Sequence, residues 1–281
     1  MKIAVLSGKG GTGKTMLSVN IASLIGDCTY IDCDVEEPNG GLFFKPEIYD
    51  RKKVSVLLPK QDETKCTGCR KCVDFCKFNA LCYVNKKVFV FNEVCHSCEG
   101  CKMLCEAGAI SMVEKVIGEI TVGKHDKTRV VSGILNLGEA SGVPIIKQLI
   151  TNYNDKSVVI DCPPGSACVV MESIKDADYC VLVAEPTVFG VHNLEMVYNL
   201  VKIFNKNFAV VINKAIKDET IVEDFCKKHS IKVLGRIAWD SELAKLSSNG
   251  EIAVNNSKYH KIFSDIYSNI LEDYNATVSN T

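Results

Sequence analysis

Fifteen cysteines stand in a chain of 281 residues, and eight of them form two short runs with the same spacing. Both runs read C-x2-C-x2-C-x3-C, and the second follows the first with a period of 29 residues. The runs are Cys66, Cys69, Cys72 and Cys76, followed by Cys95, Cys98, Cys101 and Cys105. Thiolates are soft ligands that favour iron–sulfur clusters or zinc. The duplication therefore predicts two metal centres, one for each run.

This spacing resembles that of bacterial ferredoxins, which carry two 4Fe-4S clusters. Structural zinc more often uses pairs of C-x2-C, so zinc is the second interpretation. In those ferredoxins the fourth cysteine of each run binds the other cluster. The resemblance therefore implies two crossed ligand sets. The first set is Cys66, Cys69, Cys72 and Cys105, and the second is Cys95, Cys98, Cys101 and Cys76.

The start of the chain indicates a different chemistry. Residues 8–15 read GKGGTGKT, which fits G-x-x-x-x-G-K-[ST] between an apolar strand over 2–6 and a helix over about 15–25. Backbone amides of such a loop surround phosphate, and the helix N-terminus adds partial positive charge. We expect Lys14 to reach the β- and γ-phosphates and Thr15 to bind Mg²⁺. The rest of the predicted loop is Gly8, Gly10, Gly11, Thr12 and Gly13.

The extra lysine in KGGTGKT resembles the deviant Walker A motif of the MinD/ParA/Mrp ATPases, a group that includes the nitrogenase iron protein. IDCDVEEPN (31–39) and VVIDCPPG (158–165) resemble two further motifs of that family. The resemblance implies that Lys9 reaches the nucleotide of a dimer partner. It also implies that Asp34 positions the attacking water and that Asp161 holds the Mg²⁺ shell.

A base-binding segment is the next point of resemblance. GTPases carry N-K-x-D at the strand end that matches VVINKAI, and the aspartate reads guanine. Ile216 stands at that fourth position, so the resemblance favours adenine, with Asn213 contacting the base. ATP is therefore the predicted nucleotide. The next loop departs from the family, because Ala238 stands where proline is common.

Alternating strands and helices are predicted on both sides of the cysteine region. The expected strands are 28–32, 157–161, 179–185, 208–213 and 231–237, and the expected helices include 144–153 and 259–272. Near-continuous apolar strands predict a parallel sheet covered on both faces. We therefore expect an α/β fold: a doubly wound, mostly parallel P-loop NTPase over 1–60 and 114–281. A small α+β bacterial-type ferredoxin domain is predicted over 61–113.

Composition narrows the class of protein. The formal net charge is −1 and the sequence pI is near 6.5, which does not indicate a nucleic-acid binder. No apolar run approaches the roughly 18 residues of a membrane helix, so no membrane partner is expected. We expect a cytoplasmic protein, where reducing conditions keep thiols free and metal ligation explains most of the cysteines.

Three functions remain open at this point. The first is an ATPase whose nucleotide-driven dimerisation gates electron transfer from its own 4Fe-4S clusters to a redox partner. The second is an iron–sulfur or metallocluster assembly or carrier ATPase. The third is a MinD/ParA-like positioning ATPase with structural or sensory clusters. The dimer partner could be a second copy or a paralogue. Cross-ligated clusters of the ferredoxin type exchange electrons, which favours the first function.

Cys168 lies outside the duplicated runs, seven residues after Asp161. The nitrogenase iron protein has a cysteine at the same offset, so Cys168 could face a dimer partner and hold a metal or cluster. The alternative is a buried thiol that serves only in packing. The other six cysteines are expected to be small buried hydrophobes: Cys28, Cys33, Cys82, Cys162, Cys180 and Cys226.

Overall fold

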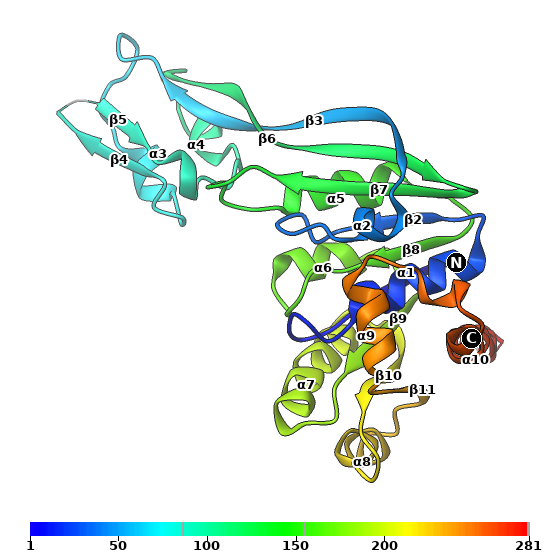
Figure 1. Ribbon diagram of the computed structural model, residues 1–281. Coiled ribbons are helices and arrows are strands. Elements are labelled where there is room, and N and C mark those ends of the chain that lie inside the picture. The colour runs from blue at the N-terminus through cyan, green and yellow to red at the C-terminus, as the bar shows by residue number, and fades with distance from the viewer. Residues whose placement is uncertain (86, 154, 280–281) are drawn as a thin grey trace.

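A nine-stranded sheet forms the body of the protein in the computed structural model, which describes residues 1–85, 87–153 and 155–279 (Figure 1). The strand order is β11-β10-β9-β1-β8-β2-β7-β6-β3. Seven strands from β11 to β7 run parallel, and β6 and β3 follow as antiparallel neighbours. The parallel strands are β1 (Lys2–Leu6), β2 (Thr29–Asp32), β7 (Thr128–Leu135), β8 (Val158–Asp161), β9 (Tyr179–Ala184), β10 (Asn207–Ala215) and β11 (Val233–Ala238).

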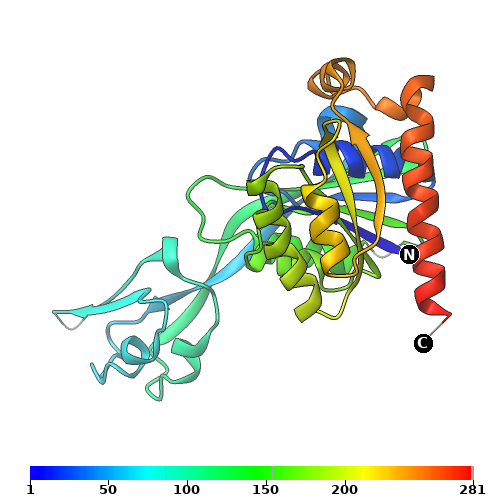
Figure 2. The same cartoon turned by 90° about the horizontal axis from the view of Figure 1, so that it is seen from below.

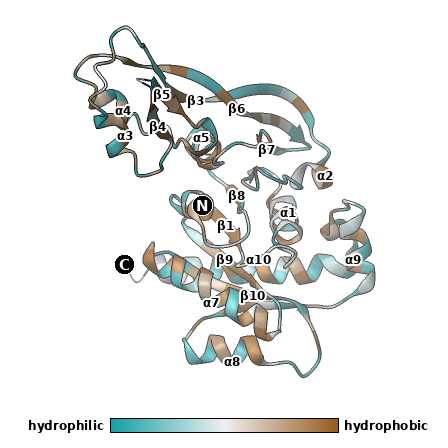
Figure 3. Ribbon diagram, turned by 90° about the vertical axis from the view of Figure 1, so that its left-hand side faces the viewer, coloured by the Kyte–Doolittle hydropathy of each residue, from teal (hydrophilic) through white to brown (hydrophobic). Residues whose placement is uncertain are grey.

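Apolar side chains on both faces explain why these strands are buried. Most residues of β1, β8 and β9 are buried, and these strands are coloured as hydrophobic in Figure 3. The predicted α/β sheet is confirmed, and its expected strands lie within one or two residues of the observed bounds. The parallel arrangement brings the carboxyl ends of β1, β8 and β9 to one edge of the sheet, where ligands of such folds bind.

Two layers of helices cover the sheet. One face is covered by α5 (Val143–Asn152), α6 (Cys168–Ile174), α7 (Val188–Ile203) and α8 (Ile221–Lys228). The other face is covered by α1 (Lys14–Ile25), α2 (Gly40–Phe44), α9 (Ser241–Ser248) and α10 (Ser257–Val278). The last helix packs on the core, because Phe263, Ile266 and Ile270 are buried against the sheet. A 3-10 turn, η2 (Ala253–Asn255), precedes α10.

A long antiparallel pair, β3 (Glu47–Gln61) and β6 (Ile110–His125), was not predicted from the sequence. It leaves the sheet edge and carries the cysteine-rich segment at its far end (Figures 1 and 2). Gln61 and Ile110 are register partners, so the chain enters and leaves this segment at adjacent points. We call the outer half of this pair, residues 55–61 and 110–116, the arm.

The segment between Gln61 and Ile110, here called the insert, is built from short elements. They are α3 (Lys71–Phe75), β4 (Leu81–Val84), β5 (Lys87–Val90), η1 (Asn92–Val94) and α4 (Gly100–Met103). The repeat seen in the sequence recurs in the backbone, because left-handed residues occupy equivalent positions of both runs. The pairs are Gly68 and Ser97, Arg70 and Glu99, and Asn79 and Gly108. The two runs therefore adopt the same turns.

Within the residues that the structure describes, no helix combines the length and the apolar character that a membrane-spanning segment requires. The longest, α10, buries its apolar side against the body and carries polar residues on the other.

Candidate nucleotide site and cysteine-lined cavities

The loop between β1 and α1 has the form of a phosphate-binding loop. Gly13 has a φ of 93°, and a side chain there would collide with the amide of Asn213. That amide donates to the carbonyl oxygen of Thr12 at 2.7 Å, which fixes the loop from the neighbouring strand β10. Lys14 is buried at the start of α1. Asn213 therefore supports the loop backbone, and its contact with adenine stays a prediction.

Acidic side chains stand beside the loop at the ends of β2 and β8. Asp161 is buried, and Tyr30 donates to its Oδ2 at 2.9 Å, while its Oδ1 has no hydrogen-bond partner. Burial raises the pKa of Asp161 to about 6, against the opposing effects of Thr15 and Lys14. An unpaired buried carboxylate oxygen next to Thr15 suits a hydrated Mg²⁺ ion.

Asp34 was predicted to position water. The structure places it among the residues that line a cavity beside the phosphate loop. Burial raises its pKa, and the charge of Lys14 opposes that effect. Its backbone amide donates to Asp32 Oδ1 at 3.1 Å, while Gly40 donates to Asp32 Oδ2 at 2.8 Å. Asp32 therefore shapes the loop that carries Asp34.

The predicted trans lysine, Lys9, does not line the cavity beside the loop, and neither do Gly8 and Thr12, whereas Gly10, Gly11, Gly13, Lys14 and Thr15 do. Its Nζ lies 2.7 Å from Oε2 of Glu185, which also pairs through Oε1 with Lys214 at 2.6 Å. Lys214 donates in turn to the carbonyl oxygen of Gly11 at 2.7 Å. Burial alone would raise the pKa of Glu185, but the hydrogen bonds from the two lysines outweigh it and lower that pKa.

Glu185 and Lys214 were not singled out by sequence reasoning. The available signal was their position, since each ends or follows an apolar buried strand at the edge where the phosphate loop lies. Their pairing depends on the neighbouring strands β9 and β10, which sequence alone does not bring into register.

The cavity beside the loop has a volume of about 620 Å³. Its walls come from the phosphate loop, the loop after β2, the end of α2 and the loop after α9. The lining residues include Gly10, Gly11, Gly13, Lys14, Thr15, Asp34, Asn39, Phe43, Lys45, Pro164 and Asn249. A glycine loop, a buried lysine and the Asp34 carboxylate surround one cavity, and the buried Asp161 lies beside Thr15, so together they form a site for a nucleotide phosphate chain with Mg²⁺.

Two further cavities lie in the insert, and each is lined by four cysteines. The first contains Cys66, Cys69, Cys72 and Cys105, and the second contains Cys76, Cys95, Cys98 and Cys101. These are the two crossed sets that the ferredoxin resemblance implies. The sets are crossed because α3 and α4 pack on each other. The cysteine after each helix therefore lies in the cavity of the other run.

Backbone hydrogen bonds to sulfur repeat in the two halves. The amide of Ala80 donates to Cys76 Sγ at 3.4 Å, and that of Ala109 donates to Cys105 Sγ at 3.2 Å. Such bonds stabilise thiolate ligands of iron–sulfur clusters. Among the described residues, however, no group of three or more His, Cys, Asp or Glu side chains has the geometry of a preformed metal site. The cysteines line the cavities without yet converging on one point.

The remaining cysteines divide into two kinds. Cys28, Cys33, Cys162, Cys180 and Cys226 are buried as predicted, whereas Cys82 is only half-buried. The packing interpretation of Cys168 is wrong, because this residue is exposed at the first position of α6. The short segment between Asp161 and α6 is hydrogen-bonded to Val5 and Ser7, just before the phosphate loop, and the Cys168 thiol that follows it lies outside the core.

The three-layer fold, the glycine loop and the two strand-end aspartates define a P-loop nucleotide-binding protein. The family model for the CobQ/CobB/MinD/ParA nucleotide binding domain matches residues 3–254. The chain belongs to this family.

Two proteins of Methanocaldococcus jannaschii match most of the chain. Uncharacterized protein MJ0578 is 29% identical over 287 residues, which cover 97% of each chain. Uncharacterized protein MJ0579 is 30% identical over 250 residues, which cover 82% of this chain and 91% of its own.

Solved structures share the fold at low identity. The cell division ATPase MinD of Pyrococcus furiosus superposes with a TM-score of 0.59 and 17% identity, covering 96% of this chain and 98% of that one. MinD of Pyrococcus horikoshii, complexed with Mg-ADP, gives 0.58 and 17%, covering 95% and 93%. These likenesses concern the fold alone.

Proposed function

We propose that the protein is an ATP-hydrolysing iron–sulfur protein whose nucleotide-driven dimerisation gates electron transfer from two 4Fe-4S clusters to a redox partner. The observation that carries this proposal is the pair of cavities in the insert, each lined by one crossed set of four cysteines. They stand on an arm that is continuous with the sheet of a P-loop domain.

The nucleotide half of the proposal assigns a task to four groups in or beside the cavity next to the phosphate loop. Lys14 neutralises charge on the β- and γ-phosphates, and Thr15 and Asp161 hold Mg²⁺ directly and through water. Asp34 orients the water that attacks the γ-phosphorus, which displaces ADP and yields inorganic phosphate. Catalysis of this kind is mostly positioning and charge stabilisation. The Mg-ADP complex of the P. horikoshii relative supports the choice of nucleotide and metal.

Dimerisation enters through Lys9. Its ammonium group pairs with Glu185 and does not line the cavity of its own chain, so Lys9 must leave this carboxylate to reach the nucleotide of a partner. The solved MinC:MinD complex of Aquifex aeolicus supports partner binding in this fold. The partner chain is a second copy or a paralogue, and the two related proteins of one archaeon support the paralogue.

The cluster assignment in this proposal depends on the ligand chemistry of the cysteines and on their positions in the two cavities. Eight thiols in two matched cavities, with amide donors to Cys76 and Cys105, fit two 4Fe-4S clusters better than zinc. Such clusters exchange single electrons when bound. The chain's own residues supply the ligands, the hydrogen bonds to sulfur and the link to the body.

A second candidate function is a positioning ATPase with structural or sensory clusters. The solved structures of similar fold support it, since they include the cell division ATPase MinD, McdA and a putative plasmid partition protein. An assembly or carrier role is a third candidate, which cluster transfer to an apo-acceptor would support.

The decisive experiment measures ATP hydrolysis and electron delivery on one preparation. After anaerobic reconstitution we expect eight irons per chain and hydrolysis that changes between oxidised, reduced and cluster-free protein. Lys9→Ala should retain much of its ATP binding and lose hydrolysis, whereas Asp34→Ala should bind ATP and persist as a dimer without turnover. Stoichiometric zinc would defeat the cluster assignment. ATP-dependent co-sedimentation with membrane or DNA would favour the positioning function.

A further inference from the structure

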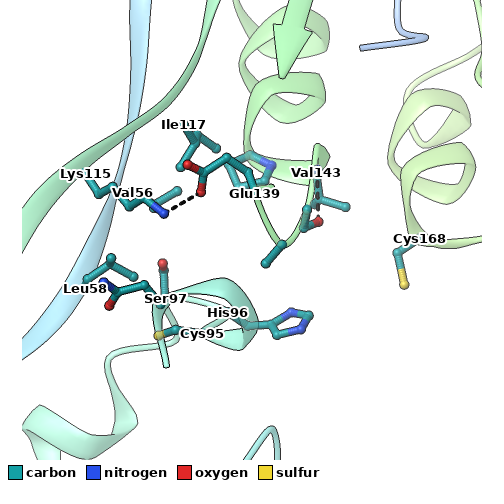
Figure 4. A pocket seen from close by; sticks show the side chains of 14 residues that line it. Val56, Leu58, Cys95, His96, Ser97, Lys115, Ile117, Glu139, Val143 and Cys168 are labelled. Carbon is teal, nitrogen blue, oxygen red and sulfur yellow. Dashed lines mark hydrogen bonds and ion pairs between the residues drawn. The ribbon is translucent and has the colours of Figure 1, made fainter. Parts of the chain in front are cut away.

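A cavity of about 280 Å³ lies where the arm, the insert and the body meet (Figure 4). The arm and the base of β6 contribute Val56, Leu58, Lys115 and Ile117. The body contributes Cys168 and the segment 139–144, and the insert contributes Asn92, Cys95, His96 and Ser97. The cavity is therefore a joint between three parts of the molecule.

Only one of the two cysteine runs contributes residues to this joint. Cys95, His96 and Ser97 belong to the second run, and the cavity has no lining residue from the first. The ring of His96 stacks on Phe78 with centroids 3.9 Å apart and planes 15° apart. Phe78 follows Cys76 closely, so the stack joins two segments that both supply the second ligand set. The equivalent positions of the other half are Thr67 and Ala107, which have no rings.

The body side of the joint is connected to the phosphate loop. Between Asp161 and Cys168, the amide of Cys162 donates to Val5 and that of Gly165 donates to Ser7, each at 3.0 Å. Ser7 precedes the glycine loop directly. Figure 4 shows the His96 ring pointing toward the side of the cavity from which Cys168 projects. A change around the phosphate loop can therefore reach the joint along a short hydrogen-bonded path.

An ion pair and a bulge connect the arm to the same joint. Lys115 on β6 pairs at 2.8 Å with Glu139, whose side chain is only 11% exposed. Val54 pairs with Gly118 and Ser55 with Val116, so Ile117 is an extra residue in the ladder. Bulges of this kind bend a strand locally. The amide of Asn136, in the loop that carries Glu139, donates to Ile117 at 2.8 Å.

We propose that this joint transmits the nucleotide state to the second ligand set, Cys76, Cys95, Cys98 and Cys101, and not to the first. The inference rests on the proposed function for what the cysteines bind. The link itself needs only the residues described above. The Lys115–Glu139 pair sets the angle of the arm at the Ile117 bulge. A shift of Cys168, at the start of α6, then displaces the loop Cys95–Ser97 across the cavity.

Hydrogen–deuterium exchange on the full chain tests this link without reference to cluster activity. Mg-ATP should change exchange of residues 92–98 by at least several-fold and leave the equivalent residues 63–69 unchanged. Glu139→Gln should abolish the change while nucleotide affinity, measured by calorimetry, remains at the wild-type value. Glu119→Gln is the matched control, because it breaks the Arg51–Glu119 pair of 2.8 Å on the body side of the bulge. This control should keep the response.

Each result decides one of the two proposals. Equal responses of 92–98 and 63–69, or no response at saturating Mg-ATP, would overturn the joint, as would an unchanged response in Glu139→Gln. Eight irons per chain with equal responses would leave the proposed function standing without the joint. A selective response in a chain that binds no iron would keep the joint and remove the proposed function.

Discussion

The body and the insert of this protein are stabilised in different ways. Two large hydrophobic clusters, one on each face of the sheet, stabilise the body. Among the residues that the structure describes, the insert takes part in a small cluster of three buried residues, in which Leu81 and Cys101 pack with Ile110 of the arm, and Cys72, Cys76 and Cys105 pack against it. Small domains with so little buried apolar surface usually need disulfides or metals. The comparison shows that buried apolar surface stabilises the body, whereas the insert has little such surface of its own, as expected if the proposed clusters hold it together.

Charged pairs show the same contrast. Glu185 is nearly buried between Lys9 and Lys214 in the body. In the insert Lys71 and Glu106 form an equally close pair that is open to solvent. Exposed pairs contribute little because water and salt screen them, whereas removing one member of a buried network leaves the other charges unsatisfied.

The largest expected effect comes from removing iron. A chelator that strips the reconstituted protein should release amide protection throughout residues 62–109, because the three-residue cluster cannot hold the insert. Protection of β1, β8 and β9 should remain. Exchange measured before and after chelation checks both parts. Full protection of the insert without metal would break the comparison.

Lys14→Ala should have the next largest effect, confined to the body. Loss of the buried ammonium group beside the phosphates should weaken ATP binding on the order of 100-fold, about 2.8 kcal/mol. Calorimetric titration with Mg-ATP measures this change. Lys71→Ala, in the insert, is the control and should bind ATP like the wild type. A weakened Lys71→Ala would mean that the insert contributes to the nucleotide site.

Glu185→Gln should lower the free energy of unfolding of the body by about 1–2 kcal/mol, because two lysines lose their carboxylate. Since the pKa of Glu185 is lowered by folding, its contribution is present above its ordinary value of 4.5 and is lost as pH falls below that value. The difference from wild type should therefore shrink in acid. Denaturant unfolding at several pH values measures it.

The matched change in the insert, Glu106→Gln, should leave unfolding unchanged, since its pair with Lys71 is exposed. An effect of Glu106→Gln as large as that of Glu185→Gln would show that exposure does not separate the two regions.

Cys168→Ser should have a small effect, below about 0.5 kcal/mol in unfolding free energy, because the thiol is exposed. Cys180→Ser, at the buried second position of β9, should cost about 1–3 kcal/mol by burying a hydroxyl group. Thermal unfolding of the two variants measures the difference in stability between a change in the core and a change at the joint. Iron content and electron delivery to a partner test whether Cys168 also takes part in transfer.

The sequence predicted those features that depend on a local pattern of residues. Apolar runs such as 179–185 predicted buried parallel strands because both faces of the sheet are covered. The glycine loop was predictable because its spacing and its strand–helix context occur together. The crossed cysteine sets followed from a resemblance, and the two cavities contain the same residues.

The failures concern partners that only the folded chain brings together. β3 is an edge strand whose first half is exposed and charged, so it lacks the apolar signal that identified the inner strands. Glu185 and Lys214 pair across β9 and β10. Cys168 resembles the buried cysteines in sequence, and its exposure depends on the path of the segment after Asp161.

The pairing of Gln61 with Ile110 has a consequence for how this chain could have originated. Because the insert begins and ends at opposed positions of one ladder, a two-residue turn between them would restore an ordinary β-hairpin. An ancestral ATPase could therefore have acquired the whole cysteine-rich unit in a single insertion event, without losing a strand or a core residue. The same geometry means that a deletion between Gln61 and Ile110 would leave the β3–β6 ladder intact, so a descendant could lose the unit in one step.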